Sequence, residues 1–252
     1  MNPFVRPRPV DEPALRVIGF HHAGGSAAVY YPMIRQFPED WDLVLLDLPG
    51  RGKRHRESLV HDMAELVDRV VEDVVPWTDA PFALFGHSLG AILAVEVARA
   101  LDGRGLPPVW VGVSGRAAPL FQKDLRRRLH ELDDEALLDE LMSMGGIPDR
   151  IHEVPEFVER FLRIVRADLR AVDSYEPNPD RTPLTCPVTA FGGTSDAWAP
   201  QEMLTAWSRE TRGGFKQRRF PGGHFYFLGP SFADFTRELV AEARKVAQPA
   251  VV

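Results

Sequence analysis

Several features that define whole classes of protein are scarce or absent in this sequence. Its single cysteine, Cys186, excludes an internal disulfide and a cysteine-based metal cluster. A net charge of −6 gives no electrostatic reason to expect nucleic acid as a partner. The longest apolar stretch, Ala91–Leu101, is interrupted by Glu96 and Arg99 and is too short to span a membrane. Neither an H-E-x-x-H motif nor a G-x-x-x-x-G-K-[ST] phosphate loop occurs, so we expect no metal site.

The composition is that of an ordinary globular protein. Of 252 residues, 44% are hydrophobic and 26% are charged, which suits one α/β domain over residues 1–252 with a sizeable core. The first thirteen residues include four prolines and no apolar segment, so they do not resemble a signal peptide. We therefore expect a cytoplasmic protein.

Short apolar runs that end at glycine or at Ser-Gly recur along the chain and are typical of buried parallel strands, although periodicity alone does not exclude buried helix. They are Leu15–Phe20, Leu43–Leu48, Phe82–Phe85, Val109–Val113 and Val188–Phe191.

Helical patterns lie between these runs. Asp62–Val75 has apolar residues at three- and four-residue spacing after an acidic residue suited to an N-cap. Leu89–Leu101 is apolar on nearly every side, which indicates a helix buried against a sheet. Such alternation predicts an α/β fold with a mostly parallel, doubly wound sheet and active residues at the carboxyl ends of its strands.

The alternation stops between residues 119 and 183. Two leucine clusters, one at 125, 129 and 132 and one at 137, 138 and 141, suggest two short helices. A longer helix is indicated by a stripe of apolar residues: Phe157, Phe161, Val165, Leu169 and Val172. Although such stripes are usually core packing, a helical insertion after a strand would lie over the carboxyl edge of the sheet. We expect a lid there.

The sequence Gly86-His87-Ser88-Leu89-Gly90 fits the pattern G-x-S-x-G. A predicted strand leads into it and a predicted buried helix leaves it, as a nucleophile elbow requires. Such a turn would hold Ser88 above the sheet edge beside a helix N-terminus. The alternative is an ordinary Gly-Ser turn.

A serine nucleophile needs a base, and the base in turn needs a carboxylate. Of the histidines after Ser88, we select His224, which follows the run Phe215–Phe220 on a glycine-rich turn. His130 and His152 lie among charged residues of the insertion, where we expect them to be solvated. For the acid we select Asp196, which follows the last of the predicted strands above. The competing carboxylates are Asp168, Asp173 and Asp180.

Two backbone amides would complete the catalytic group. One is that of Leu89, directly after the serine, and the other lies in the glycine-rich loop after the first predicted strand. In that loop we select Ala23 over Gly24 and expect His21 and His22 to brace the loop through side-chain hydrogen bonds.

At this point the chain resembles the type II thioesterases of polyketide and nonribosomal peptide synthetases, a family within the α/β-hydrolases. The matching stretches run in the family's order along almost the whole chain after its N-terminal arm: His22-Ala23-Gly24-Gly25-Ser26, Leu48-Pro49-Gly50-Arg51-Gly52, Gly86-His87-Ser88-Leu89-Gly90, Ser114-Gly115-Arg116, Gly193-Thr194-Ser195-Asp196 and Pro221-Gly222-Gly223-His224-Phe225. His21 stands where a proline is common, and Ala117 where a second arginine is common.

The resemblance implies an α/β-hydrolase fold with a helical lid and an editing hydrolase. Such an enzyme removes aberrant short acyl groups from the phosphopantetheine arms of carrier proteins, which bring the arm with them, so no separate cofactor is expected. Because carrier proteins are generally acidic, the basic segment with Arg51, Arg54 and Arg56 is a candidate docking patch, as are the three arginines 126–128. Such charge runs are more often simply solvated surface segments, and that is the alternative for both.

Rival interpretations use the same residues. A thioesterase that releases medium-chain fatty acids from a fatty acid synthase would need a longer acyl channel, and an oxygen-ester hydrolase or lipase would differ in substrate. A non-catalytic binding protein with the hydrolase fold is a further alternative, although such proteins often lack one of the serine, aspartate and histidine. Nothing in the sequence demands an oligomer, so we expect a monomer.

Overall fold

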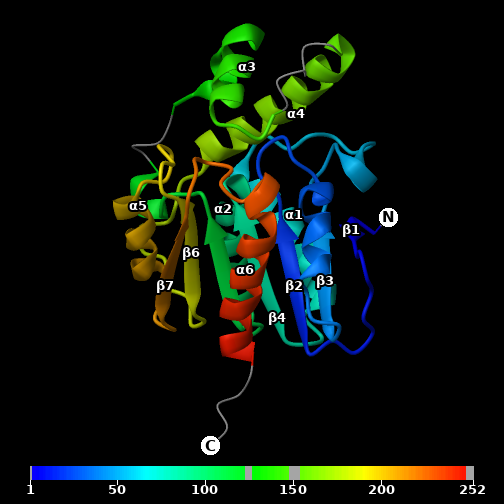
Figure 1. Cartoon of the computed structure of the whole chain (residues 1–252), viewed down its shortest axis with the longest axis vertical. Coiled ribbons are helices and arrows are strands. Elements are labelled where there is room, and N and C mark those ends of the chain that lie inside the picture. Colours follow the sequence, from blue (N-terminus) through cyan, green and yellow to red (C-terminus); the bar gives the residue numbers. More distant parts are fainter. Residues whose placement is uncertain (1, 123–126, 148–153, 248–252) are drawn as a thin grey trace, which may run out of the picture.

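The centre of the fold is a seven-stranded sheet in the order β1-β3-β2-β4-β5-β6-β7 (Figure 1). The computed structural model describes residues 2–122, 127–147 and 154–247. The strands, all within these ranges, are β1 (Phe4–Val5), β2 (Leu15–Phe20), β3 (Trp41–Leu46), β4 (Phe82–His87), β5 (Trp110–Ser114), β6 (Val188–Gly193) and β7 (Phe215–Phe220). Only β1, paired with β3, is antiparallel, and every other pair is parallel. The predicted mostly parallel sheet is confirmed.

Each of the five predicted apolar runs is a strand; Leu15–Phe20 has the predicted bounds, and the other four are shifted by one or two residues at one or both ends. The largest shift is in β3, which covers Trp41–Leu46 rather than Leu43–Leu48. The sequence did not predict β1, whose Phe4 pairs with Leu46 and is buried. A two-residue strand among prolines has no periodicity of its own, because its pairing depends on a distant partner.

Helices cover both faces of the sheet, and each face has its own hydrophobic core. On one side, α1 (Met63–Val74) and α2 (Leu89–Gly103) pack against strand residues such as Ile18 and Leu84. On the other side, the 3-10 segment η1 (Ala27–Arg35) and α6 (Phe232–Ala247) pack against the alternate residues, such as Val17 and Phe85. This division follows from the two-residue period of a strand.

Both predicted helices in this part of the chain are present. Helix α1 begins where the Asp62 side chain accepts a hydrogen bond from the Glu65 amide at 2.9 Å, as expected of an N-cap. Helix α2 is buried on nearly every side. No described helix is both long enough and apolar enough to cross a membrane.

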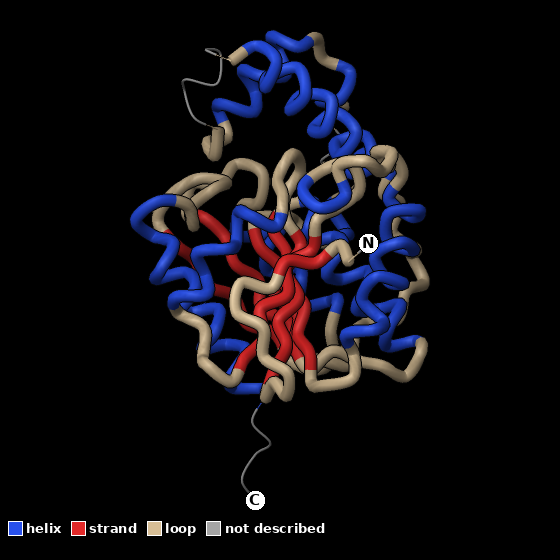
Figure 2. The backbone as a smooth tube through the Cα atoms, turned by 90° about the vertical axis from the view of Figure 1, so that its right-hand side faces the viewer, coloured by secondary structure: helices blue, strands red, loops and turns tan. Residues whose placement is uncertain are grey.

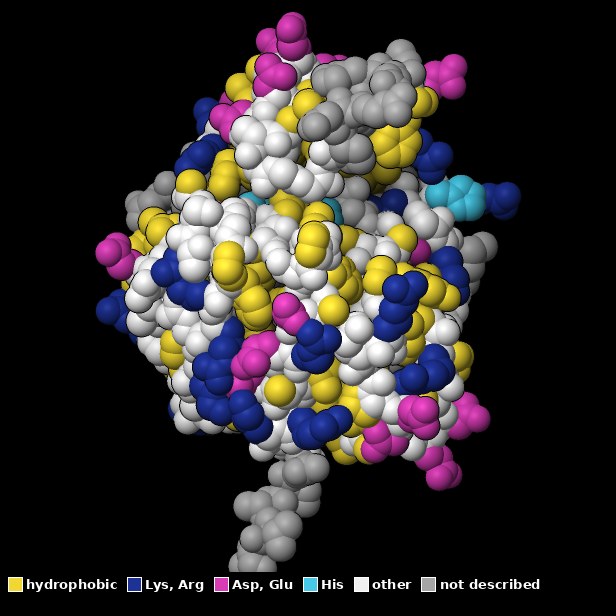
Figure 3. All heavy atoms as spheres, viewed as in Figure 1, with side chains coloured by type: hydrophobic (Ala, Val, Ile, Leu, Met, Phe, Trp, Pro, Cys, Tyr) yellow, Lys and Arg dark blue, Asp and Glu magenta, His cyan; other side chains and the backbone are white. Residues whose placement is uncertain are grey.

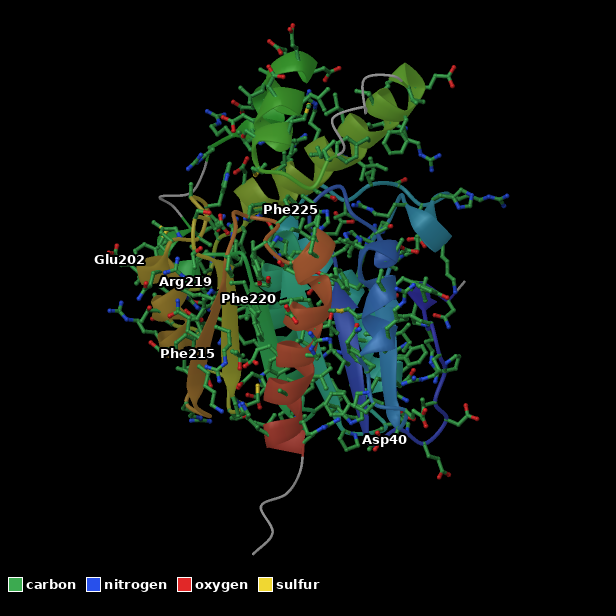
Figure 4. The ribbon with its side chains drawn as sticks, viewed as in Figure 1. Asp40, Glu202, Phe215, Arg219, Phe220 and Phe225 are labelled. Carbon is green, nitrogen blue, oxygen red and sulfur yellow. The ribbon has the colours of Figure 1, made fainter. Side chains whose placement is uncertain are left out.

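The edge strand β7 carries charged side chains, including the exposed Lys216 and Arg219. Lys and Arg side chains gather on this part of the surface in Figure 3. In Figure 4, Phe215 and Phe220 mark the two ends of the strand, and α5 (Gln201–Thr205), with Glu202, lies beside it. Charges on an edge strand oppose pairing with the sheet of another molecule.

Between β5 and β6 the chain leaves the sheet and forms a helical cap over the strand ends (Figures 1 and 2). We call residues 119–183 the lid. Its described helical elements are η4 (Pro119–Phe121), η6 (Leu129–Glu131), α3 (Asp134–Ser143) and α4 (Pro155–Ser174). The predicted helical position at Leu125 lies outside the described residues. Within the α4 stripe, Val165 is fully buried, but Phe157 is 56% exposed and is not core.

Candidate active site

Ser88 lies at the junction of β4 and α2 in a strained backbone conformation. Its φ is 55° and its ψ is −113°, a combination that a residue with a side chain rarely adopts. Its amide donates a hydrogen bond to the Ser114 carbonyl at 2.8 Å, which ties the turn to the end of β5. The predicted strand–turn–helix context of Ser88 is therefore present.

The two glycines of the G-x-S-x-G pattern have a steric reason. A Cβ atom on Gly86 would lie 1.9 Å from the Gly90 carbonyl oxygen, and one on Gly90 would lie 2.1 Å from the Phe20 carbonyl oxygen. Neither neighbour is a flexible side chain, so no other residue fits at these positions. The glycines let the turn and the start of α2 approach β2 closely.

His224 and Asp196 come together from the ends of β7 and β6. The His224 Nδ1 atom lies 3.1 Å from Asp196 Oδ2, and both side chains are buried. Asp196 Oδ1 accepts a second hydrogen bond from the Trp198 amide at 2.9 Å. With Nδ1–H donated to the carboxylate, the ring's Nε2 is the nitrogen left to accept a proton.

Close contact between two loops holds this pair in place. The Ser195 amide donates to the Gly222 carbonyl at 2.9 Å. A Cβ atom on Gly193 would lie 2.2 Å from the Gly223 carbonyl oxygen, so the loops after β6 and β7 touch with no room for a side chain. The glycines around Asp196 and His224 thus position them.

The amides of Ala23 and Leu89 are both free to bind an oxyanion. In the described part of the chain, no acceptor takes the hydrogen of either amide. The amide of Gly24, in contrast, donates to Asp168 Oδ2 at 2.8 Å, which favours Ala23 as the donor from this loop. Leu89 is the first residue of α2, where the helix dipole adds positive potential.

Three further histidines surround this site. His21 braces the loop as predicted, since its Nδ1 contacts the His22 carbonyl at 2.8 Å and its Nε2 accepts from the Leu48 amide at 3.4 Å. For His22 the prediction is wrong, because it packs edge-on against Phe225 and its buried Nδ1 has no partner among the described residues. Burial lowers the pKa of His22 to about 3 and that of His87 well below its usual value. Both rings are therefore neutral at pH 7.

A cavity of about 100 Å³ lies between the strand ends and the lid, and Ser88 and His224 line it. Its lid-side wall is mostly apolar and includes Leu129, Leu141, Met144, Ile147, Phe161, Leu169 and Val172. In Figure 4, Phe225 lies at the top of the sheet beneath the lid, and Asp40 marks the opposite edge. Hydrophobic side chains are visible where the lid meets the sheet in Figure 3.

Sequence reasoning missed part of this lining. Apolar stripes are usually core packing, yet Phe161, Leu169 and Val172 of the α4 stripe line the cavity. Arg116 also lines it, and burial lowers the pKa of its guanidinium to about 10. Its NH2 group donates to Gln122 Oε1, which belongs to the lid base. Among the described residues, no group of three or more metal-ligating side chains occurs.

Most of the predicted docking patch is not available on the surface. Arg51 is 5% exposed and pairs with Asp168, while Arg54 is 9% exposed and pairs with Glu57 and Asp73. A buried charge must find a partner, which explains why both are engaged. Arg56 is exposed.

The second basic run contributes one residue to the cavity rim. Arg127 is exposed, lines the cavity and lies over the Trp198 ring at 3.9 Å. Arg128 pairs with Glu131, and Arg126 lies outside the described residues.

The competing acids and bases are engaged elsewhere or exposed. His130 is not simply solvated as predicted, because its Nδ1 contacts Asp173 Oδ2 at 2.6 Å and its side chain is 19% exposed. Asp168 is paired with Arg51, and Asp180 is exposed. His152 lies outside the described residues.

The α/β-hydrolase class is defined by a mostly parallel sheet, a serine at a strand–helix elbow and a His–Asp pair on loops after later strands of the same sheet. This chain has all three, with a helical lid over the strand ends. Residues 16–240 match the model of the thioesterase domain, and the chain belongs to that family. It is 37% identical over 220 residues to the thioesterase PikA5 of Streptomyces venezuelae, covering 86% of this chain and 77% of PikA5. It is 34% identical over 241 residues to the human medium-chain S-acyl fatty acid synthase thioesterase, covering 94% of this chain and 89% of that protein.

One of the similar proteins is considerably longer than this chain. The chain spans 60% of a probable cadicidin biosynthesis thioesterase of Streptomyces griseus, to which it is 35% identical over 221 residues, or 88% of this chain. Among solved structures, the RedJ thioesterase from the prodiginine pathway of Streptomyces coelicolor superimposes with a TM-score of 0.85 at 38% identity, over 91% of each chain. The predicted resemblance to type II thioesterases is thus confirmed.

Proposed function

We propose that this protein is a serine thioesterase that removes short acyl groups from the phosphopantetheine arm of carrier proteins in a polyketide or nonribosomal peptide synthetase. The observation that carries the proposal is that His224, hydrogen-bonded to Asp196, lines the same cavity as Ser88. Relatives from the cadicidin and prodiginine biosynthetic pathways support the carrier-bound substrate. A cytoplasmic location and a monomeric state stay predictions.

In the acylation step, Ser88 Oγ attacks the thioester carbonyl carbon while His224 Nε2 takes the hydroxyl proton. The carbonyl oxygen becomes an oxyanion between the amides of Ala23 and Leu89. When the tetrahedral intermediate collapses, the carbon–sulfur bond breaks and the thiol leaves with the proton held by His224. The acyl group stays on Ser88 as an ester.

Deacylation repeats these steps with water as the nucleophile. His224 takes a proton from water, the resulting hydroxide attacks the acyl-Ser88 ester, and the same two amides bind the oxyanion. Ser88 regains its proton from His224 as the carboxylic acid leaves. Asp196 keeps Nδ1 protonated and stabilises the imidazolium in both steps. No separate cofactor enters this scheme, because the arm arrives with the carrier.

The size of the cavity favours short acyl groups. At about 100 Å³ it is smaller than the engineered cavity of roughly 150 Å³ that accommodates benzene in another protein. A cavity of this size is better filled by a short chain, such as an acetyl, propionyl or butyryl group, than by a medium chain. This is the observation that separates the proposal from the fatty acid rival, despite the human relative.

A chain-length series tests the substrate proposal. With acyl-pantetheine thioesters from acetyl to decanoyl, we expect kcat/KM to be highest at two to four carbons, since a cavity of about 100 Å³ leaves little room to bury further methylenes. Matched oxygen esters should be poorer substrates because their leaving group is more basic. A maximum at eight or more carbons would support fatty acid release instead, and faster cleavage of oxygen esters would indicate a general esterase.

Charge at Arg127, on the cavity rim, and at Arg56, exposed in the segment after β3, should affect carriers more than small substrates. Reversing the charge at Arg127 or at Arg56 should lower kcat/KM for an acyl-carrier protein about tenfold by slowing association. The neutral acyl-pantetheine should change by less than about twofold. Arg237→Glu on α6, where Arg237 is 62% exposed, is the matched control outside the lid. Equal losses on both substrates, or an equal loss in the control, would reject carrier docking at these two arginines.

A further inference from the structure

One buried carboxylate of the lid has no part in the mechanism above. Asp168, on α4, is only 1% exposed, yet it lies in the lid and not in the sheet core. It makes contact with two separate loops of the sheet domain. Its Oδ2 accepts the Gly24 amide hydrogen at 2.8 Å, and both of its oxygens accept hydrogen bonds from the Arg51 guanidinium.

Arg51 extends this link to the loop after β3. Its NH2 group donates to Asp168 Oδ1 at 2.8 Å and to the Pro49 carbonyl at 3.1 Å. The contact between Arg51 and Asp168 is bidentate and therefore directional, and it is shielded from solvent because both side chains are buried. One carboxylate therefore joins the lid helix, the loop after β2 and the loop after β3.

Packing reinforces the link to the loop after β2. Gly24 has a φ of +75°, and a Cβ atom there would lie 2.4 Å from Val165 Cγ2 and 3.0 Å from Phe161 Cε2. Both neighbours are on α4, one and two turns before Asp168. The helix thus presses directly on the Gly24 backbone while Asp168 holds its amide.

This contact bears on the oxyanion site through the geometry of one peptide bond. The Gly24 N–H belongs to the planar peptide group that also contains the Ala23 carbonyl. Holding that plane limits the rotation of Ala23, whose own amide is the proposed oxyanion donor. If α4 moved away, the loop would lose both its hydrogen bond and its packing surface.

We infer that Asp168, together with Arg51, is a positioning pair that sets the Ala23 amide, so that the oxyanion hole is complete only when α4 is seated on the loop. The inference rests on the proposed function, since it concerns the oxyanion of the same reaction. Asp168 acts through Gly24 and touches no reacting atom.

The test compares transition-state binding with substrate binding in Asp168→Asn. We expect kcat for propionyl-pantetheine to fall about tenfold to a hundredfold. A displaced oxyanion donor loses part of the transition-state stabilisation that is lost when the donor is absent. The inhibition constant of propylboronic acid, which forms a tetrahedral adduct on a catalytic serine, should rise by a similar factor. KM should change by less than about threefold, because substrate binds mainly through the acyl cavity and the arm.

Two further variants separate positioning from general stability. Arg51→Gln/Asp168→Asn removes both charges and so leaves none unpaired, and we expect the same loss in kcat and boronate affinity. Arg54→Gln removes a buried, paired arginine three residues away that does not contact Gly24. It should lower the melting temperature and leave kcat and boronate binding as in the unaltered protein.

The inference is wrong if Asp168→Asn and the double variant keep their kcat and boronate affinity. It is equally wrong if their losses only follow the fall in melting temperature, as in Arg54→Gln. Failure of the proposed function is a separate result, namely that the unaltered protein cleaves no short thioester. In that case a loss of boronate binding in Asp168→Asn would still support positioning of the loop.

Discussion

Replacing Ser88 with alanine is expected to lower kcat for short acyl thioesters by about a millionfold, the scale seen when a catalytic serine is removed from another serine hydrolase. Without Oγ no acyl-enzyme can form, and water must attack the substrate directly. Only the oxyanion amides and the cavity would then contribute. The turnover rate of propionyl-pantetheine measures the loss of kcat. The intact mass of the protein during turnover shows whether an acyl-enzyme forms.

The fold should be unaffected by this change. No described residue forms a hydrogen bond with the Ser88 hydroxyl, and alanine has the same Cβ in the same strained turn. The melting temperature of Ser88→Ala should therefore match that of the unaltered protein, which makes it a clean control. A folded Ser88→Ala protein that retained more than about 1% of the rate would contradict the covalent mechanism.

Asp196→Asn is expected to lower kcat about ten-thousandfold, as the equivalent change does in another triad. An asparagine amide would donate to Nδ1 and so place the ring proton on Nε2, where it cannot accept the serine proton. His224→Ala should cost at least as much, because it removes the base itself. Since the two groups act as one unit, the double variant should lose little more than either single variant.

The measurement is kcat for each variant on the same thioester, with folding checked by circular dichroism. Asp180→Asn is the matched control, because Asp180 is an exposed carboxylate of the lid segment. If Asp196→Asn kept most of the activity, another carboxylate would have to orient the histidine. Multiplicative losses in the double variant would show that the two residues act separately.

The elbow could be predicted from sequence because its causes are local. Gly86 and Gly90 are required by contacts within a few residues and with one neighbouring strand, and the flanking apolar run and helix have their own periodicity. His224 and Asp196 follow strand ends of the same sheet, so topology alone brings them near each other. Their hydrogen bond could be proposed without knowing any long-range detail.

The exposure of the arginines after β3 could not be predicted from the sequence. Arg51, Arg54 and Arg56 look alike in sequence, yet only Arg56 is exposed. Arg51 is buried because Asp168, on a helix far along the chain, lies against it. A run of charges carries no information about which member meets a distant carboxylate.

The apolar stripe of α4 has the same limitation. Helical spacing predicts which residues share a face, but it does not say what that face meets. Val165 is buried against the rest of the lid core, Phe161 and Leu169 line the cavity, and Phe157 is exposed. The size of the cavity, on which the proposed preference for short acyl chains rests, depends on these positions and required the structure.

The most direct test of the proposed function is the mass of an acyl-carrier protein during incubation with this protein. Propionyl-carrier should lose the mass of its acyl group rapidly with the unaltered protein and not with Ser88→Ala, while decanoyl-carrier is cleaved more slowly. Retention of the propionyl group with both proteins, or equal loss with both, would contradict an editing thioesterase that acts through Ser88.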